Sequence, residues 1–196
     1  ELTIYSQLTQ ARAIKTATEA HRRNMPNTMG SMYWQIDDCW PTMSWSSVDY
    51  FGLWKAAHYA ARKANQDILL SWQLDKRRLT LQGISDLEQD IKGELQLRLH
   101  KFNGDTLWAD TLNTSIPATS STLLFESDVY SIIRFERRTG IVLEASLYQE
   151  GKRVSRSLFY LTKPKNLILP QPQIRFFIDG SRAGNKHKVT LEALTF

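Results

Sequence analysis

Apolar residues in the first third of the chain recur at the spacing of an α-helix. Between residues 3 and 24 they fall every three or four positions, which predicts a helix with one buried stripe. Pro26 ends that helix, since proline has no N–H with which to continue it. A short apolar run at 31–36 predicts a buried strand, a loop follows at 38–49, and helical spacing returns at 53–63. This order is that of an α/β unit, which cannot close a hydrophobic core alone.

After residue 65 the pattern changes to the alternation of half-buried strands. The segments that alternate are 68–74, 79–84, 94–102, 107–112, 122–125, 132–135, 141–148 and 154–161. Asn103-Gly104 predicts a type I′ hairpin turn, because both central residues of that turn need a positive φ. Glu150-Gly151 joins the last two segments. A density of about seven short strands per 100 residues is typical of an immunoglobulin-like sandwich.

The last part of the chain begins with a stiff linker. Residues 163–172 contain three prolines, which favour an extended backbone. Two strands are expected at 174–178 and 189–194, joined by a turn at 179–185, and two strands are marginal on their own. The predicted units are residues 1–64, residues 65–161, and residues 162–196, which hold the linker and the start of a second sandwich.

Composition narrows the class of protein. Of the 196 residues, 42% are hydrophobic and 23% are charged, which is typical of a globular protein. The net charge of +5 comes from Lys and Arg spread along the chain, without a basic stripe interleaved with aromatics, so we expect no nucleic-acid partner. No apolar run approaches the roughly 20 residues of a spanning helix, so we expect no membrane partner. Because Glu1 stands within a helical pattern, we expect the chain to be part of a longer protein.

Metal, disulfide and phosphate-binding chemistry find no support in the sequence. Cys39 is the single cysteine, so no intrachain disulfide is expected. The four histidines lie in different predicted elements without the spacing of metal ligands. No glycine-rich phosphate loop is present. We therefore expect neither a metal site nor a cofactor.

Aromatic residues and carboxylates gather at 30–59, which hold four of the six tryptophans. In an extended strand the indole of Trp34 either packs a core or offers a flat surface to the apolar face of a sugar ring. Asp37 and Asp38 are neighbours, and neighbouring strand residues point to opposite faces, so they cannot act together as acid and base. Retaining glycosidases hold two carboxyl groups about 5–5.5 Å apart. One aspartate is expected to brace the loop, and the other to be solvated or to bind a hydroxyl.

The segment TMGSMYWQIDDCWPTMSWSSVDYFGLWKAAHYAARK, residues 28–63, resembles the last strand and last helix of the catalytic barrel in β-mannosidases of glycoside hydrolase family 2. The spacings W-Q-x-x-D-x-W-P and S-W-S-S-x-D-Y carry the resemblance. It implies a mixed fold: the end of a (β/α)8 TIM barrel, then an all-β immunoglobulin-like sandwich, then the start of a second β-sandwich. The clan also contains β-galactosidases and β-glucuronidases.

The resemblance also implies an activity, namely removal of terminal β-linked mannose with retention by two glutamates that lie upstream of Glu1. By it, the substrate-binding residues are Trp34, Gln35, Asp37 and Trp40, although the family commonly has Asn at position 37. The loop-ordering residues are Trp45, Ser46, Asp49 and Tyr50. None of these residues is catalytic, so the segment alone is expected to be inactive.

The implied partners are a β-mannoside oligosaccharide and the remainder of the parent chain. The residues themselves leave the compartment open, and the resemblance slightly favours a periplasmic, secreted or lysosomal location over a cytoplasmic one. The alternatives are a non-catalytic carbohydrate-binding or scaffold immunoglobulin-like module, and another member of the clan.

Overall fold

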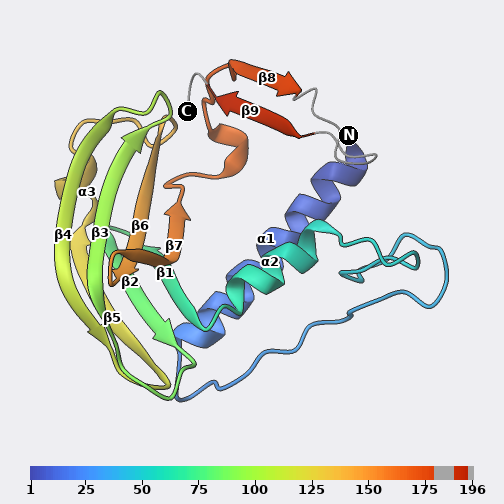
Figure 1. Ribbon diagram of the computed structural model, residues 1–196, viewed down its shortest axis with the longest axis horizontal. Helices are drawn as coiled ribbons and strands as arrows, with labels where there is room; N and C mark the ends of the chain where they lie inside the picture. Colours follow the sequence, from blue (N-terminus) through green and yellow to red (C-terminus); the bar gives the residue numbers. More distant parts are fainter. Residues whose placement is uncertain (179–187, 194–196) are drawn as a thin grey trace.

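The structure is a computed structural model that describes residues 1–178 and 188–193. It begins with two helices that lie side by side, α1 (Leu2–Arg23) and α2 (Ala56–Ala64) (Figure 1). The small residues Ala57, Ala61 and Ala64 form the buried face of α2, which allows close approach of the two helices. The predicted first helix is confirmed. No helix in the described ranges is long and apolar enough to cross a membrane.

The segment between the two helices is a long loop that extends away from the sheets (Figure 1). The strand predicted at 31–36 does not form, because its backbone finds only the loop itself as a partner: the N–H groups of Ser47 and Val48 donate to the carbonyl of Ile36. Isolated bridges join Val48 to Asp37 and to Trp54. The second bridge holds Trp54 extended, so α2 begins later than the helix predicted at 53–63.

In the described residues, seven antiparallel strands form the two sheets of a sandwich. The three-stranded sheet has the order β1 (Ile68–Asp75), β2 (Arg78–Ser85), β5 (Ser120–Asp128). The four-stranded sheet has the order β4 (Thr106–Ile116), β3 (Ile91–Lys101), β6 (Ile141–Gln149), β7 (Lys152–Phe159). Alternate residues of both sheets enclose one core, in which Leu81, Leu97 and Leu143 are fully buried. The immunoglobulin-like expectation for this region is confirmed.

The strand predicted at 132–135 is wrong, since the chain forms a short helix there, α3 (Val129–Ile133). Val129, Ile132 and Ile133 are all buried, at the i, i+3 and i+4 positions of one helical face, whereas a strand would send the two isoleucines to opposite sides. The side chain of Asp128 caps this helix by accepting the N–H of Tyr130 at 2.8 Å.

The two predicted hairpin turns differ in geometry. At Glu150-Gly151 both residues have a positive φ, 51° and 76°, so the predicted join between β6 and β7 is confirmed. At Asn103-Gly104 only Gly104 has a positive φ, 95°. The N–H of Gly104 donates to the carbonyl of Lys101 at 3.0 Å, which is the pattern of a three-residue loop with a left-handed glycine. The predicted type I′ turn is therefore wrong there.

The last described elements are a short 3-10 turn, η1 (Pro164–Asn166), and the strands β8 (Ile174–Ile178) and β9 (Val189–Ala193), which pair with each other. The expected turn at 179–185 and residue 194 of the last predicted strand lie outside the described residues. The domain boundaries at 64/65 and 161/162 stay a prediction.

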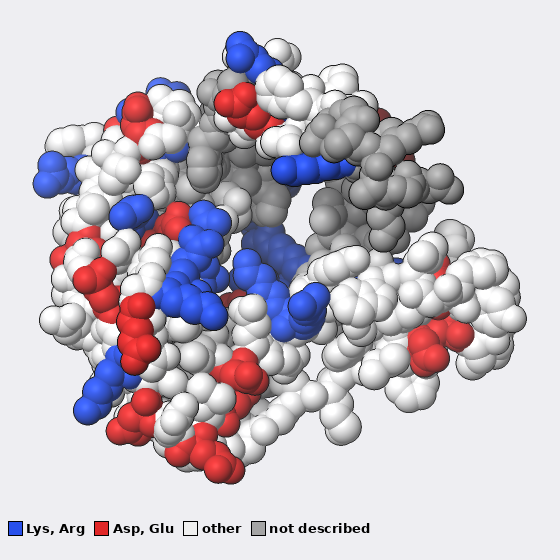
Figure 2. Space-filling view, viewed as in Figure 1, with Lys and Arg blue, Asp and Glu red and all other residues white. Residues whose placement is uncertain are grey.

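The fold changes how charge is distributed. Figure 2 shows a group of Lys and Arg side chains near the centre of one face, with Asp and Glu side chains distributed around it. Positive charge that is spread along the sequence is thus partly brought together in space.

Arg22, in the last turn of α1, ties the helices to the sandwich. Its guanidinium donates to the backbone carbonyls of Ala64 and Gln66 at 2.7 and 2.8 Å, and to the carboxylate of Asp86 at 2.8 Å. Arg22 is buried, and its bond to the Ala64 carbonyl is buried with it, whereas the bonds to Gln66 and Asp86 are only partly buried. They join the end of α1 to the end of α2 and to the loop after β2.

Candidate functional site

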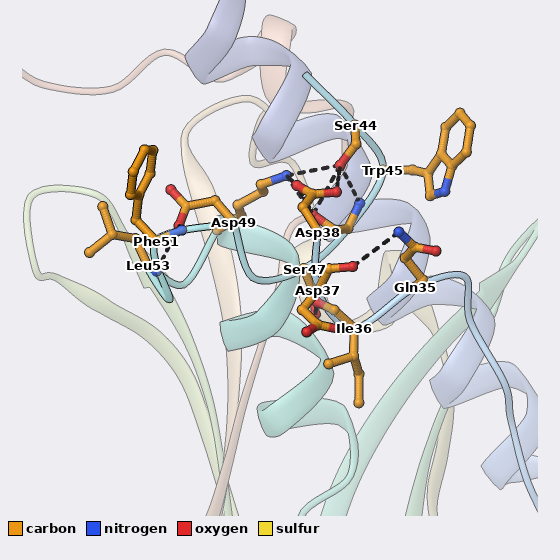
Figure 3. Close-up of polar contacts among 12 residues, drawn as sticks. Gln35, Ile36, Asp37, Asp38, Ser44, Trp45, Ser47, Asp49, Phe51 and Leu53 are labelled. Carbon is orange, nitrogen blue, oxygen red and sulfur yellow. Dashed lines mark hydrogen bonds and ion pairs between the residues drawn. The ribbon is translucent and has the colours of Figure 1, made fainter. Parts of the chain in front are cut away.

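The loop between the helices is organised around the carboxylate of Asp38. This group accepts hydrogen bonds from the hydroxyls of Ser44 at 2.5 Å and Ser46 at 2.7 Å, and its Oδ2 lies 3.2 Å from the Nζ of Lys55 (Figure 3). The Lys55 ammonium also donates to Ser46 at 2.7 Å. The Ser44 and Ser46 hydroxyls, with Lys55, hold the pKa of Asp38 below its ordinary value. Asp38 is buried and ionised, so it braces the loop and does not supply a proton.

A second set of bonds orders the turn that leads into α2. The Oδ1 atom of Asp49 accepts the backbone N–H groups of Phe51 and Leu53 at 2.9 and 2.8 Å. The buried hydroxyl of Ser47 lies 3.1 Å from the hydroxyl of Tyr33 and 3.0 Å from the Nδ1 of His58. These bonds connect the start of the loop to α2.

The residues expected to contact a sugar lie on the outside of this braced loop. Trp34 is 73% exposed and Trp40 is 64% exposed. Asp37 is exposed as well, and the side-chain amide of Gln35 donates to its backbone carbonyl at 3.0 Å. The peptide bond between Trp34 and Gln35 is cis.

The residues expected to order the loop divide into two groups. Ser46 is fully buried and Asp49 accepts backbone bonds, as described above. Trp45 and Tyr50 expose their rings, at 62% and 50%, and the ring of Trp45 points away from the Asp38 network (Figure 3). The backbone carbonyl of Trp45 accepts a hydrogen bond from the side-chain amide of Gln10 on α1. For Trp45, the contact to the rest of the fold is thus made by its backbone.

Sequence reasoning missed part of the bracing network. The sequence pattern does not reveal the roles of Lys55, Ser44 and His58, because these roles depend on contacts across the loop. The available signal was the aspartate within W-Q-x-x-D-x-W-P, which is Asp38 rather than Asp37. In the described part of the chain, no group of three or more His, Cys, Asp or Glu side chains is arranged to hold a metal ion. The loop offers flat apolar rings beside amide and carboxylate groups, a combination suited to a polyhydroxylated ligand.

Comparison with known proteins identifies the family. The profile of the Mannosidase Ig/CBM-like domain matches residues 77–166. The β-mannosidase of Mus musculus is 32% identical over 178 residues, which are 86% of this chain and 19% of that protein. The crystal structure of the β-D-mannosidase from Dictyoglomus thermophilum superposes with a TM-score of 0.82 at 26% identity, covering 97% of this chain and 23% of that one.

The chain belongs to the β-mannosidases of glycoside hydrolase family 2. The predicted family resemblance is thereby confirmed. The β-mannosidase of Capra hircus is 34% identical over 142 residues, 67% of this chain and 16% of that protein. The chain spans about a fifth of the length of these relatives.

An exo-chitosanase from Amycolatopsis orientalis shares the fold alone with this β-mannosidase family member. It superposes with a TM-score of 0.70 at 20% identity and covers 96% of this chain and 26% of the chitosanase. The part matched by the family profile contains strands β2 to β7, so the Mannosidase Ig/CBM-like domain corresponds to the sandwich.

Proposed function

We propose that this chain is part of a retaining exo-β-mannosidase that removes terminal β-D-mannose from oligosaccharides or glycoconjugates. Residues 1–64 form the end of its (β/α)8 catalytic barrel, and the loop from Trp34 to Asp49 forms part of the sugar pocket. One observation supports this most strongly. The loop is held in place by the buried Asp38 network, yet Trp34 and Trp40 remain largely exposed. A loop ordered by polar groups, with its indoles outside the core, is suited to hold those rings against a ligand.

The residues of the pocket have different roles. Trp34 and Trp40 provide apolar surfaces for the sugar ring, and Gln35 and Asp37 provide hydrogen-bonding groups for its hydroxyls. Asp38 is paired with Lys55 and stabilises the loop rather than binding the sugar. The two catalytic glutamates belong to sequence before Glu1. The chain alone therefore lacks a nucleophile and a general acid, and we expect it to be inactive.

The remainder of the parent chain is the natural partner of the exposed apolar surfaces. In the first half of α1, Ile4 and Leu8 are 63% and 56% exposed, although they fall on the apolar stripe. On β8, Phe176 and Ile178 are also more than half exposed. Apolar side chains in such number are normally covered by other protein surface. A barrel before α1 and a completed sandwich around β8 would cover them.

The test is hydrolysis of an aryl β-mannoside by the longer protein that carries this sequence. Trp34→Ala should lower kcat/KM by roughly 10- to 100-fold, because one aromatic contact contributes about 1.5–3 kcal/mol and 1.4 kcal/mol is a tenfold change. Phe135→Ala removes a fully exposed ring far from the loop in sequence and should leave kcat/KM unchanged. Turnover by the pure 196-residue chain, or an unaffected Trp34→Ala enzyme, would refute the proposal. Aryl β-galactosides and β-glucuronides, assayed in parallel, separate the other members of the clan.

A scaffold role is a second candidate for the sandwich, and the packing of its tryptophans favours it. Trp72 is 4% exposed, with its ring centroid 6.2 Å from that of Phe125 and 6.3 Å from that of Phe159. Trp108 packs on the same Phe125 at 6.0 Å. Trp72 lies in the core and Trp108 is half-buried against it, so neither forms an exposed platform for a glycan. Binding of sugar by the sandwich would require other residues.

A further inference from the structure

The outward face of the four-stranded sheet carries a cleft of about 860 Å³. On β3, Leu95, Leu97 and Leu99 are fully buried, so the alternate residues Glu94 and Gln96 point away from the core. The cleft lies over the start of β3, the end of β4 and the turn between β6 and β7.

Strand register places three of its side chains in one row. Glu94 is paired with Asn113 of β4 on one side and with Tyr148 of β6 on the other. Side chains in register on neighbouring strands share a face, and the row crosses two strand spacings, roughly 10 Å. An aromatic ring, a carboxylate and a primary amide therefore stand side by side along the cleft.

The backbone beside Tyr148 is closely packed and irregular. A Cβ on Gly93 would lie 2.3 Å from the carbonyl oxygen of Tyr148, so only glycine allows the two strands to approach so closely. The register between β6 and β7 shifts between Leu147 and Tyr148, as at a β-bulge, which changes the direction of a side chain. The turn Glu150-Gly151 closes one end of the cleft.

The chemistry of the lining favours a neutral ligand with many hydroxyl groups. The lining holds one cation, Lys92, and two carboxylates, Glu94 and Glu150. The side-chain amide of Gln96 donates to the Glu94 carboxylate at 2.7 Å. Hydroxyl and amide groups from β4 supply further donors and acceptors. Because the charges are mixed, a strongly charged ligand gains little net attraction. A pyranose ring, by contrast, offers an apolar face to Tyr148 and hydroxyls to Glu94 and to the β4 side chains.

We propose that this cleft is a second carbohydrate site, which binds a neutral oligosaccharide on the outward face of the sandwich. Tyr148 stacks against one sugar ring, and Asn113 and Glu94 hydrogen-bond its hydroxyls. The site is separate from the loop that contains Trp34, and it performs no chemistry. It retains a glycan that the parent enzyme degrades or carries.

Titration of the 196-residue chain with β-1,4-linked mannotriose, followed by calorimetry and by NMR chemical shifts, tests the proposal. Saturable binding is expected, with Tyr148→Ala weakening the affinity by about tenfold, the lower end of the range expected for Trp34, because the Tyr148 side chain is already half-buried against the sheet. Asn113→Ala, on the edge strand β4, should weaken it less. Phe135→Ala is the matched control, because it removes an equally sized and fully exposed ring outside the cleft, and its affinity should equal that of the unsubstituted chain.

Three results would overturn the proposal. The first is absence of binding to mannotriose at millimolar concentrations. The second is binding that both Tyr148→Ala and Asn113→Ala retain and that Trp34→Ala removes, which would assign the sugar to the loop. The third is a preference for an acidic oligosaccharide over mannotriose. If Tyr148→Ala does not fold, two other measurements test the site. They are the NMR chemical-shift changes of the Asn113 amide when mannotriose is added to the unsubstituted chain, and the affinity of Asn113→Ala for mannotriose. Hydrolysis of aryl β-mannosides by the parent enzyme is a separate readout, so either proposal can fail alone.

Discussion

Replacing Arg22 by Met tests whether one buried guanidinium holds the helices on the sandwich. Methionine keeps most of the apolar stem and removes the three hydrogen bonds to Ala64, Gln66 and Asp86. The region before β1 is two helices and a loop, which cannot close a core alone. The attachment of α1 depends on these contacts together with the hydrogen bonds that join Glu19 and Arg23 to the hydroxyl of Ser71 on β1.

The three bonds do not contribute equally to the free energy of unfolding. The carboxylate of Asp86 is 47% exposed, so water replaces Arg22 there, and the pair contributes at most about 1 kcal/mol. The carbonyls of Ala64 and Gln66 lose a charged donor in a buried or half-buried setting, at about 1–2 kcal/mol each. Arg22→Met should thus lower the free energy of unfolding by roughly 2–5 kcal/mol. Asp86→Asn, which keeps both carbonyl bonds, should lower it by less than about 1 kcal/mol.

Urea unfolding of both variants measures these free energies, and hydrogen exchange localises the change. In Arg22→Met the amides of α1 and α2 should lose protection, while those of β3 and β6 keep it, because the sandwich has its own core. Equal destabilisation by Arg22→Met and Asp86→Asn would refute the assignment of most of the free energy to the two carbonyl bonds. A stable Arg22→Met chain with protected helices would refute the attachment itself.

Two further predictions concern the four-stranded sheet. Gly93→Ala should destabilise the chain by roughly 1–3 kcal/mol in thermal unfolding, because the new Cβ meets the backbone carbonyl of Tyr148. Gly140→Ala is the control and should have little effect, since the space around Gly140 is open. Burial raises the pKa of Glu144, but hydrogen bonds dominated by Arg156 outweigh it and hold the pKa below the ordinary value of 4.5. The stability that Glu144 provides is therefore complete above pH 4.5 and is lost as the pH falls through the lower pKa of the folded state. In urea unfolding, the difference in free energy of unfolding between the unsubstituted chain and Glu144→Gln should shrink in acid. Parallel pH profiles of the two proteins would contradict this.

The alternation of apolar and polar residues was enough to predict most strands of the sandwich, because successive side chains of a strand point to opposite faces of the sheet. Leu95, Leu97 and Leu99 alternate with polar residues, and the structure buries all three. The same reasoning failed at Ile132 and Ile133, where two adjacent apolar residues fit a strand or one turn of helix equally well. There the capping side chain of Asp128 and the core around Val129 decided for the helix.

The family can be recognised from the sequence because the W-Q-x-x-D-x-W-P spacing is continuous along the chain. The positions of the site residues in space cannot be predicted in this way, since they depend on contacts between groups that are distant in the sequence. Asp38 is braced by Lys55, 17 residues later, and Glu94 stands between Asn113 and Tyr148 only because strand register aligns them. Helix and strand periods are properties of neighbouring residues, and a sequence carries them directly. Register, burial and the exposure of Trp34 arise from the whole chain packing at once, and the tertiary structure alone decided them.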